Sequence, residues 1–283
     1  MSECRLLSRT MQMIELTRNI KQPKSKNLVF SSVGNHSNLS LWLRGKDDFD
    51  LWISYYGDEK NRYREQCDFY MEKKGGKFPA LYYVYQHWKT LLDQYDAILV
   101  MDDDIVIDGY SIVKLFRIRK NYDFWLLQPA FDKKGKISHP ITKQNQDTFL
   151  RFTNFVENTC PLFRKNKLDL FMQAYDPILV GWGIDWWYME LFSEGTNRRK
   201  IAVVDSISCI NPLDHTKGGQ REILLLEDTP TRIKHWHMIR DRYHITSEKK
   251  GFTEYGFIKH DNFLSQIKTR LTGLLNPDNS KMK

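Results

Sequence analysis

The sequence has no long apolar run, no closely spaced pair of cysteines and no repeated or low-complexity segment. A membrane-spanning helix needs roughly 18 consecutive apolar residues, and no such stretch occurs. Residues Met1–Arg5 lack the apolar block of a secretory signal, so we expect a cytoplasmic protein. The four cysteines, Cys4, Cys67, Cys160 and Cys209, form no C-x-x-C pair, which argues against a zinc site or a disulfide scaffold and favours reduced thiols.

Acidic residues are outnumbered: 35 Asp and Glu stand against 43 Lys and Arg, a net charge of +8. A basic surface attracts nucleic acid, but here the basic residues are spread along the chain and no nucleic-acid motif accompanies them. We therefore expect no nucleic-acid partner. Anionic lipid attracts basic proteins in the same way, so peripheral contact with the inner face of a membrane stays open.

The chain of 283 residues is 41% hydrophobic, enough to bury a full core. We expect an N-terminal lead-in (1–26), one large domain (27–245) and a C-terminal helical extension (246–283). Within the extension, apolar residues between Phe263 and Leu275 fall on one helical face. That pattern suits either a helix at a membrane surface or, as we prefer, a helix docked on its own domain.

Short apolar runs alternate with amphipathic segments through most of the chain. The runs predict strands at 27–32, 50–55, 98–101, 124–128 and 201–205, and helical spacing predicts helices at 80–94, 111–120, 169–175 and 186–194. This alternation predicts an α/β fold, with a mostly parallel sheet flanked by helices.

Three consecutive carboxylates, Asp102, Asp103 and Asp104, directly follow the apolar run 98–101. A buried strand cannot hold three charges inside, so they must lie at its exposed carboxyl end, where open α/β sheets bind ligands. Carboxylate oxygens suit Mg²⁺ or Mn²⁺, and such ions bind diphosphates. The alternative is a solvated acidic turn that caps the helix beginning near Ser111.

A second informative segment is Gly181–Tyr188, GWGIDWWY, where Asp185 stands among tryptophans. The rings offer flat walls for a sugar, and a carboxylate beside them is desolvated enough to act as a general base. The plainer interpretation is that Asp185 caps a buried aromatic helix.

Further candidates lie in polar loops with aromatic neighbours. Glu157, in the segment 152–161, is a second candidate base, and the segment 138–142 could line an acceptor site with it. His215 lies in a loop beyond the strand 201–205 and could complete a carboxylate metal site, with His235 and His237 as rivals. Irregular loop packing and structural histidines are the alternatives.

Taken together, these segments resemble a family of glycosyltransferase-like proteins, a domain of unknown function found in bacteria and plants. The resemblance covers about residues 27 to 220, in the family's order. It rests on 33–37 with 42–43, 49–57, 74–81, 102–104 with Asp108, 128–130, 138–142, 153–157, 181–185 and 215–216.

The resemblance implies the GT-A fold, a Rossmann-like sheet whose Asp-x-Asp motif holds the ribose and a divalent metal on a nucleotide-sugar. Asp102 would then contact the nucleotide, and the metal ligands would be Asp102, Asp104 and His215. Asp185 is similar in placement to the catalytic Asp of the Trp-Gly-Gly-Glu-Asp motif in inverting galactosyltransferases. The residues expected to bind the nucleotide are Ser32, Gly34, Asn35, Asp58, Lys77, Asp102 and Asp103.

The expected function is metal-dependent transfer of a sugar from a nucleotide-sugar donor to a hydroxyl of a glycan or lipid-linked glycan. Asp185 or Glu157 would be the base, with Mn²⁺ or Mg²⁺ as cofactor. Two other classes stay open. In a haloacid-dehalogenase-like phosphatase Asp102 would be the nucleophile and Asp104 the acid and base, and a binding module without activity would keep the nucleotide-sugar site alone.

Overall fold

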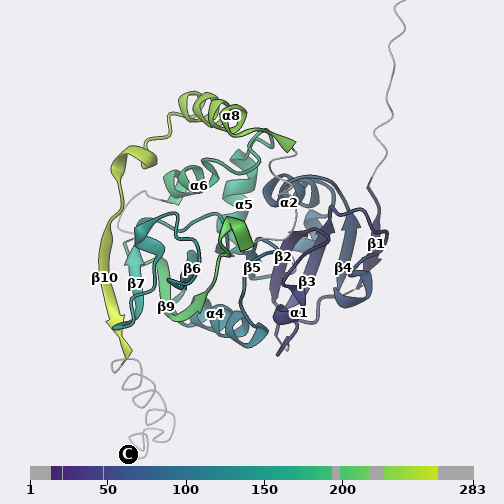
Figure 1. The fold of residues 1–283 in the computed structure, drawn as a ribbon, viewed down its shortest axis with the longest axis horizontal. Coiled ribbons are helices and arrows are strands. Elements are labelled where there is room, and N and C mark those ends of the chain that lie inside the picture. Colours follow the sequence, from purple (N-terminus) through teal and green to yellow (C-terminus); the bar gives the residue numbers. More distant parts are fainter. Residues whose placement is uncertain (1–13, 21, 47, 193–197, 217–225, 261–283) are drawn as a thin grey trace, which may run out of the picture.

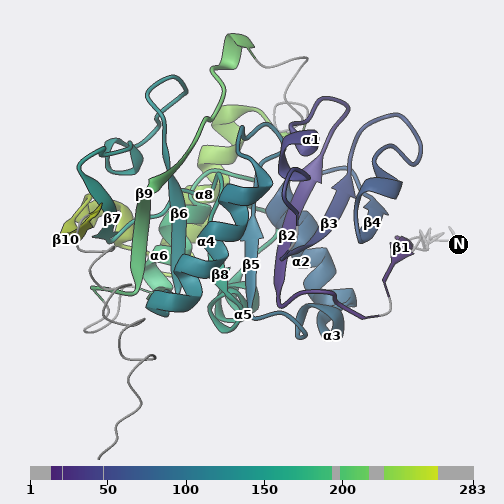
Figure 2. The ribbon, with the colours of Figure 1, turned by 90° about the horizontal axis from the view of Figure 1, so that it is seen from below.

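A ten-stranded mixed sheet runs through the part of the chain that the structure describes, and Figures 1 and 2 show it from two sides. The structure is a computed structural model that describes residues 14–20, 22–46, 48–192, 198–216 and 226–260. Across the sheet the strands follow the order β1 (Leu16–Asn19), β4 (Phe69–Glu72), β3 (Asp50–Tyr55), β2 (Asn27–Val33), β5 (Ala97–Val100), β8 (Leu162–Arg164), β6 (Leu126–Phe131), β9 (Ile201–Cys209), β7 (Thr148–Thr153) and β10 (Glu254–Lys259).

Most of these strands run in one direction. The neighbours β4, β3, β2 and β5 are mutually parallel, as are β6 and β9, whereas β1, β8 and β7 run antiparallel to the strands beside them. The central strands β2, β3 and β5 are apolar and almost wholly buried, as expected for parallel strands covered on both faces. The predicted α/β fold with a mostly parallel sheet is confirmed.

Helices cover both faces of the sheet (Figure 1). One layer contains α2 (Lys77–His87), α3 (Lys89–Leu92), α5 (Lys165–Ala174), α6 (Ile184–Phe192) and α8 (Thr229–Arg242), whose apolar side chains join one core cluster. The other layer contains α1 (Leu39–Trp42) and α4 (Gly109–Tyr122), which join a second cluster. Single turns of 3₁₀-helix occur at η1 (Arg64–Gln66), η2 (Pro140–Thr142), η3 (Asp214–Thr216) and η4 (Ser247–Lys250).

Three segments differ from the sequence prediction. Part of the expected lead-in forms β1, which pairs with β4. The single helix predicted at 80–94 is interrupted at Trp88, where φ is −134° and ψ is 37°. Residues 254–259 of the expected helical extension form the edge strand β10.

The apolar helical face predicted at 263–275 lies outside the described residues, so the membrane helix and the division of the chain into three parts stay predictions. Among the described residues, no helix is both long and apolar enough to cross a bilayer.

Candidate active site

A cavity of about 1110 Å³ opens at the carboxyl edge of the sheet. Strands β2 and β5 end there because they are parallel, and the segment before β8 arrives at the same edge because β8 is antiparallel to β5. The topology thus brings together residues that are far apart in the sequence. Of the expected site residues, the cavity is lined by Ser32, Asn35, Lys77, Asp102, Asp103, Asp104, Glu157 and Asp185.

The three consecutive aspartates have different surroundings. Asp102 is 40% exposed in its side chain and forms an ion pair of 2.7 Å with Nζ of the buried Lys77. The same Nζ donates to the carbonyl of Thr159 at 2.8 Å, which ties the start of α2 to the segment before β8. Asp104 lines the cavity, and its carbonyl accepts a hydrogen bond of 2.6 Å from Nδ2 of Asn38. These backbone contacts fix the turn that carries the carboxylates.

Asp103 is the most enclosed of the three. Its Oδ2 accepts hydrogen bonds from the backbone N–H of Gly34 at 2.8 Å and from the hydroxyl of Tyr56 at 3.0 Å. Burial, together with the neighbouring charge of Asp104, nevertheless raises the pKa of the Asp103 carboxyl to about 7. Asp103 therefore fastens β5 to the end of β2, and Gly34 takes part through its backbone.

Glu157 is a buried carboxyl beside Asp102 and Lys77. It is 4% exposed, and its Oε1 accepts a hydrogen bond of 2.7 Å from the Thr159 hydroxyl. Burial is the main cause that raises the pKa of Glu157, and the charge of Asp102 adds to it, while Lys77 opposes both. Burial therefore favours the protonated form of Glu157 more than it would be favoured in an exposed glutamic acid.

Asp185 lies in the first turn of α6 and is 6% exposed. A helix N-terminus favours the ionised form of a carboxyl, but burial has a larger effect here. Burial, together with the charge of Glu157, raises the pKa of Asp185 to about 7. A carboxyl that titrates near neutral pH in a cavity has the property required of a general base.

Cations and aromatic rings complete the lining. Arg62, Lys136 and Arg232 join Lys77 as basic groups, and the N-terminus of α2 adds its backbone N–H groups at Gly76 and Lys77.

Trp182, which is 47% exposed, lines the cavity with Trp186 and His139. Phe252 stacks on Trp186 with ring centres 5.5 Å apart. The cavity lining therefore combines basic groups, a larger number of carboxyl groups and an apolar wall.

Several of these residues were missed by the sequence prediction. Tyr56 and Asn38 hold the aspartate turn from neighbouring loops, and Arg62 and Arg232 belong to segments without a motif. Of these residues, only Tyr56 could have been suspected from the sequence, because it lies between the strand β3 and the turn residue Gly57.

Three expected site residues are absent from the cavity lining: Gly34, which bonds to Asp103 through its backbone, and Asp58 and His215, which lie farther from the site. Asp58 is 83% exposed in its side chain and forms an ion pair of 2.9 Å with Lys74. His215 is exposed in η3, where its neighbour Asp214 pairs with Lys136 at 2.8 Å. Within the described ranges, no three His, Cys, Asp or Glu side chains form a group that could hold a metal, so the expected grouping of Asp102, Asp104 and His215 is not found.

The rival histidines lie on α8. Nδ1 of His235 is 3.1 Å from a carboxylate oxygen of Glu227, and His237 is exposed. Neither is among the residues that line the cavity.

Gly183 fixes the loop that carries Asp185. Its φ of +83° disfavours any L side chain, and an added Cβ would lie 2.1 Å from the ring of the fully buried Trp236. We expect Gly183→Ala to lower the free energy of unfolding by at least about 2 kcal/mol, through backbone strain and overpacking together. Chemical denaturation measures this. Gly251→Ala is the control, because its φ is +67° but nothing lies within 4 Å of the added Cβ; equal losses in both variants would contradict the role of Trp236.

No protein-family model and no curated protein sequence matches the chain. The similar solved structures include TarS 1–349 of S. aureus in complex with UDP, with a TM-score of 0.44 at 13% identity, over 66% of this chain and 60% of that one. GalNAc-T7 with UDP, GalNAc and Mn²⁺ has a TM-score of 0.47 at 13% identity, over 76% and 48%. The mannosyltransferase PcManGT of Pyrobaculum calidifontis with GDP-Man and Mn²⁺ has a TM-score of 0.41 at 8% identity, over 71% and 60%. The match spans less than two thirds of the length of each of these three structures and every TM-score is below 0.5, so the similarities carry no ligand and no activity over to this chain.

Proposed function

We propose that the chain is a glycosyltransferase that moves a sugar from a nucleotide-sugar donor to a hydroxyl of a glycan or lipid-linked glycan. The observation that supports this most directly is the content of one cavity. It places an aspartate turn, several cations, an aromatic wall and a carboxyl with a pKa of about 7 side by side. Each of these serves a different part of such a reaction.

The aspartate turn is suited to the donor. The carboxylate of Asp102 is held in place by Lys77 and would accept hydrogen bonds from the ribose. Asp104, with Asp102, would hold Mn²⁺ or Mg²⁺. The donor set fits, because such ions prefer oxygen ligands and bind through one or two carboxylates together with substrate phosphates, without a full protein cage. When bound, the ion would neutralise charge on the diphosphate leaving group.

Cations on the other walls would bind the diphosphate itself. Arg62 pairs with Glu59 at 2.5 Å and stacks on Tyr63 at 5.0 Å, so its guanidinium is held at the rim of the cavity. The backbone N–H groups at the start of α2 present further donors to an anion. Together they would stabilise negative charge as the bond to the sugar breaks.

Asp185 would receive the proton of the attacking hydroxyl. The sugar of the acceptor would pack on Trp182 and Trp186, which flank Asp185 in the sequence. If the hydroxyl attacks from the side opposite the diphosphate, the transfer would invert the anomeric carbon. Glu157 is the second candidate base, and its position next to Asp185 would let it hold the transferred proton.

A thermal-shift panel of nucleotide-sugars, with and without Mn²⁺, tests the proposal. A ligand that binds only the folded state raises the melting temperature, so we expect a rise with at least one nucleotide-sugar that depends on the metal. No rise with any nucleotide-sugar would contradict it. Release of inorganic phosphate from a simple phosphoester would instead favour a phosphatase, and tight nucleotide binding without sugar loss, with varied acceptors present, would favour a binding module.

Asp104→Asn is expected to abolish metal-dependent binding of a nucleoside diphosphate while the protein stays folded. The change removes a metal ligand and relieves repulsion among the clustered carboxylates. Calorimetric titration with Mn²⁺ and nucleotide measures the loss, which should exceed about tenfold in Kd. Asp58→Asn is the matched control, because Asp58 is exposed and lies outside the cavity lining. Unchanged affinity in Asp104→Asn would contradict the metal site.

A further inference from the structure

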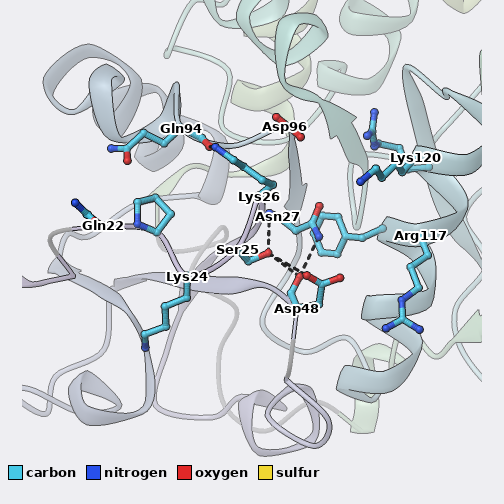
Figure 3. A pocket seen from close by; sticks show the side chains of 13 residues that line it. Gln22, Lys24, Ser25, Lys26, Asn27, Asp48, Gln94, Asp96, Arg117 and Lys120 are labelled. Carbon is cyan, nitrogen blue, oxygen red and sulfur yellow. Dashed lines mark hydrogen bonds between the residues drawn. The ribbon is translucent and has the colours of Figure 1, made fainter.

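A second cavity of about 550 Å³ lies at the opposite, amino edge of the sheet. The segment before β2, the loop before β5 and the last turns of α4 surround it, so it is remote in topology from the aspartate turn. Figure 3 shows Lys26 on the first of these segments, with its amine beside Gln94, and Arg117 and Lys120 on α4.

Positive charge dominates this amino-edge cavity. Its lining contains five cations, Lys24, Lys26, Arg117, Arg119 and Lys120, and two carboxylates, Asp48 and Asp96. Lys24 is neutralised by Asp68, to which it donates at 2.9 Å. Lys26 donates only to a neutral carbonyl, that of Gln94, at 3.1 Å. Even without Lys24, four cations face two carboxylates, and the cavity has an excess of positive charge.

Arg119 is the unusual member, because it is 8% exposed and forms no close ion pair with a carboxylate of the described residues. Its Nε is buried without a hydrogen-bond partner among the described residues. Asp123, at the end of the same helix, is already paired with Arg164 at 2.9 Å and with Lys200 at 2.6 Å. Burial, and the charge of Arg164, lower the pKa of Arg119, and the charges of Asp96 and Asp123 offset only part of this. A buried guanidinium without a partner is costly, so the folded chain keeps a cation here that its own residues do not satisfy.

The partial negative charge at the end of α4 explains only part of this arrangement. Helix C-termini favour cations in the last turn, which accounts for the exposed Lys120. This preference at the helix end does not account for Arg119, because no carbonyl among the described residues accepts a hydrogen bond from its buried Nε. An anion bound in the cavity would compensate the charge of the Arg119 guanidinium.

We propose that the amino-edge cavity binds a phosphate group, held by Arg119 at its base and by Lys26, Arg117 and Lys120 at its rim. Guanidinium groups bind phosphate oxygens through paired, charge-assisted hydrogen bonds, and the exposed lysines add point charges. The bound phosphate would connect the segment before β2 to α4. This site goes beyond the proposed transferase activity and does not depend on it.

Thermal unfolding with inorganic phosphate and with pyrophosphate, against potassium chloride of equal ionic strength, tests the proposal on three proteins. The parent should melt at a higher temperature in phosphate than in chloride. Arg119→Met should melt higher than the parent in chloride, because the unpaired buried charge is gone, and its Kd for phosphate should be at least about tenfold weaker. Lys114→Met is the matched control, since Lys114 is an exposed cation of α4 outside the lining, and it should respond like the parent.

A second experiment distinguishes a free phosphate compound from a lipid headgroup as the source of the phosphate. Flotation with phosphatidylcholine vesicles, with and without phosphatidic acid, asks whether a lipid headgroup is bound by the parent and lost in Arg119→Met. A response to phosphate in solution assigns a free phosphate compound, and a response to phosphatidic acid alone assigns a headgroup. If Arg119→Met failed to fold, the double variant Arg117→Gln with Lys120→Gln, both exposed positions, should still weaken binding several-fold. No response of the parent in either arm, or an equal response of Arg119→Met, would overturn the site.

Discussion

Asp185→Asn is expected to reduce sugar transfer on the order of 10² to 10⁴-fold while nucleotide-sugar binding is kept. The substitution removes the proton acceptor and preserves the shape of the side chain in its buried place at the start of α6. Turnover with a responding donor and acceptor measures the first effect, and calorimetric titration of the donor measures the second. Turnover within a few-fold of the parent would leave Asp185 as a helix cap or an acceptor contact, with Glu157 as the next base to test.

The pH dependence of kcat/KM and of stability distinguishes a catalytic base from a helix cap at Asp185. The pKa of Asp185 is raised to about 7, and only the ionised form accepts a proton, so kcat/KM of the parent should rise as the pH increases through about 7. The stability of the parent should fall as the pH rises from about 4, the ordinary pKa of the carboxyl, to about 7, because in that range only the folded state keeps the proton on Asp185. Asparagine is neutral at every pH. The variant should therefore lose less stability than the parent between about pH 4 and about pH 7.

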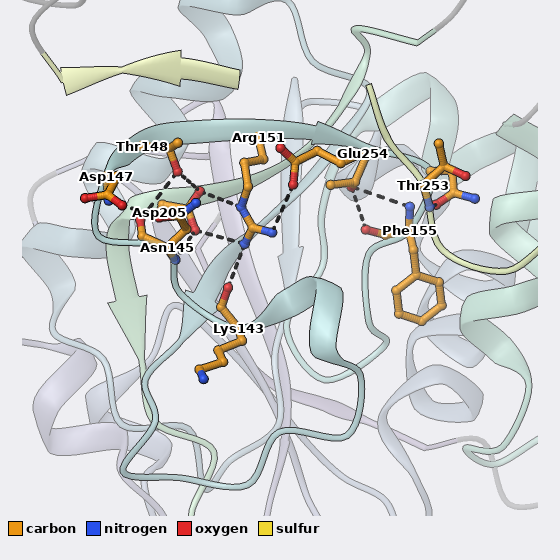
Figure 4. A network of polar contacts seen from close by, with 11 residues as sticks. Lys143, Asn145, Asp147, Thr148, Arg151, Phe155, Asp205, Thr253 and Glu254 are labelled. Carbon is orange, nitrogen blue, oxygen red and sulfur yellow. Dashed lines mark hydrogen bonds and ion pairs between the residues drawn. The ribbon is translucent and has the colours of Figure 1, made fainter. Parts of the chain in front are cut away.

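Arg151→Met is expected to lower the free energy of unfolding by about 3 to 5 kcal/mol. Arg151 of β7 donates to Asp205 of β9 through Nε at 2.9 Å and through Nη2 at 3.0 Å, and both side chains are buried (Figure 4). Its Nη1 also lies 3.5 Å from Glu254 of β10. Without the arginine the carboxylate of Asp205 stays buried, with only Thr148 and the N–H of Asn145 as donors. Chemical denaturation measures the loss.

Arg164→Met is the matched control for Arg151→Met. Arg164 forms an ion pair of the same length with Asp123, but their side chains are 38% and 57% exposed. Exposed pairs contribute little, so this variant should lose less than about 1 kcal/mol. Equal losses of unfolding free energy in the two variants would show that burial does not determine how much the Arg151–Asp205 pair contributes to stability.

The central sheet and the position of the aspartate turn could be predicted from the sequence because both follow from local patterns. The runs in β2, β3 and β5 are too apolar and too short for anything but buried strands, and charge must leave such a strand at its end. The carboxyl ends of parallel strands meet at one edge. Asp102 and Asp104 accordingly lie in one cavity, as predicted, and Glu157 and Asp185 lie there too.

Other features depend on contacts between distant segments, and a local pattern does not contain them. Strand β8 has three residues and is defined by its neighbours β5 and β6. Strand β10 has an exposed face and contains Gly256, so its pairing with β7 leaves no periodic signal. The enclosure of Asp103 depends on Gly34 and Tyr56, which are brought to it by the sheet. The sequence prediction assigned Asp58 and His215 to the site from the local pattern of their loops alone, because that pattern does not contain the contacts between distant segments.

The pairing of β10 with β7 also has a consequence for how the chain is made. Glu254 lies opposite Thr153 in this ladder, so about a hundred residues must be synthesised between the two partners. Until residues 254–259 leave the ribosome, β7 is an open sheet edge with unpaired backbone groups, and Arg151 lacks its contact with Glu254. A nascent chain that pauses before this point exposes an edge able to pair with another chain. Strand β10 therefore covers the edge of β7, and among the described residues it becomes the outer edge of the sheet itself.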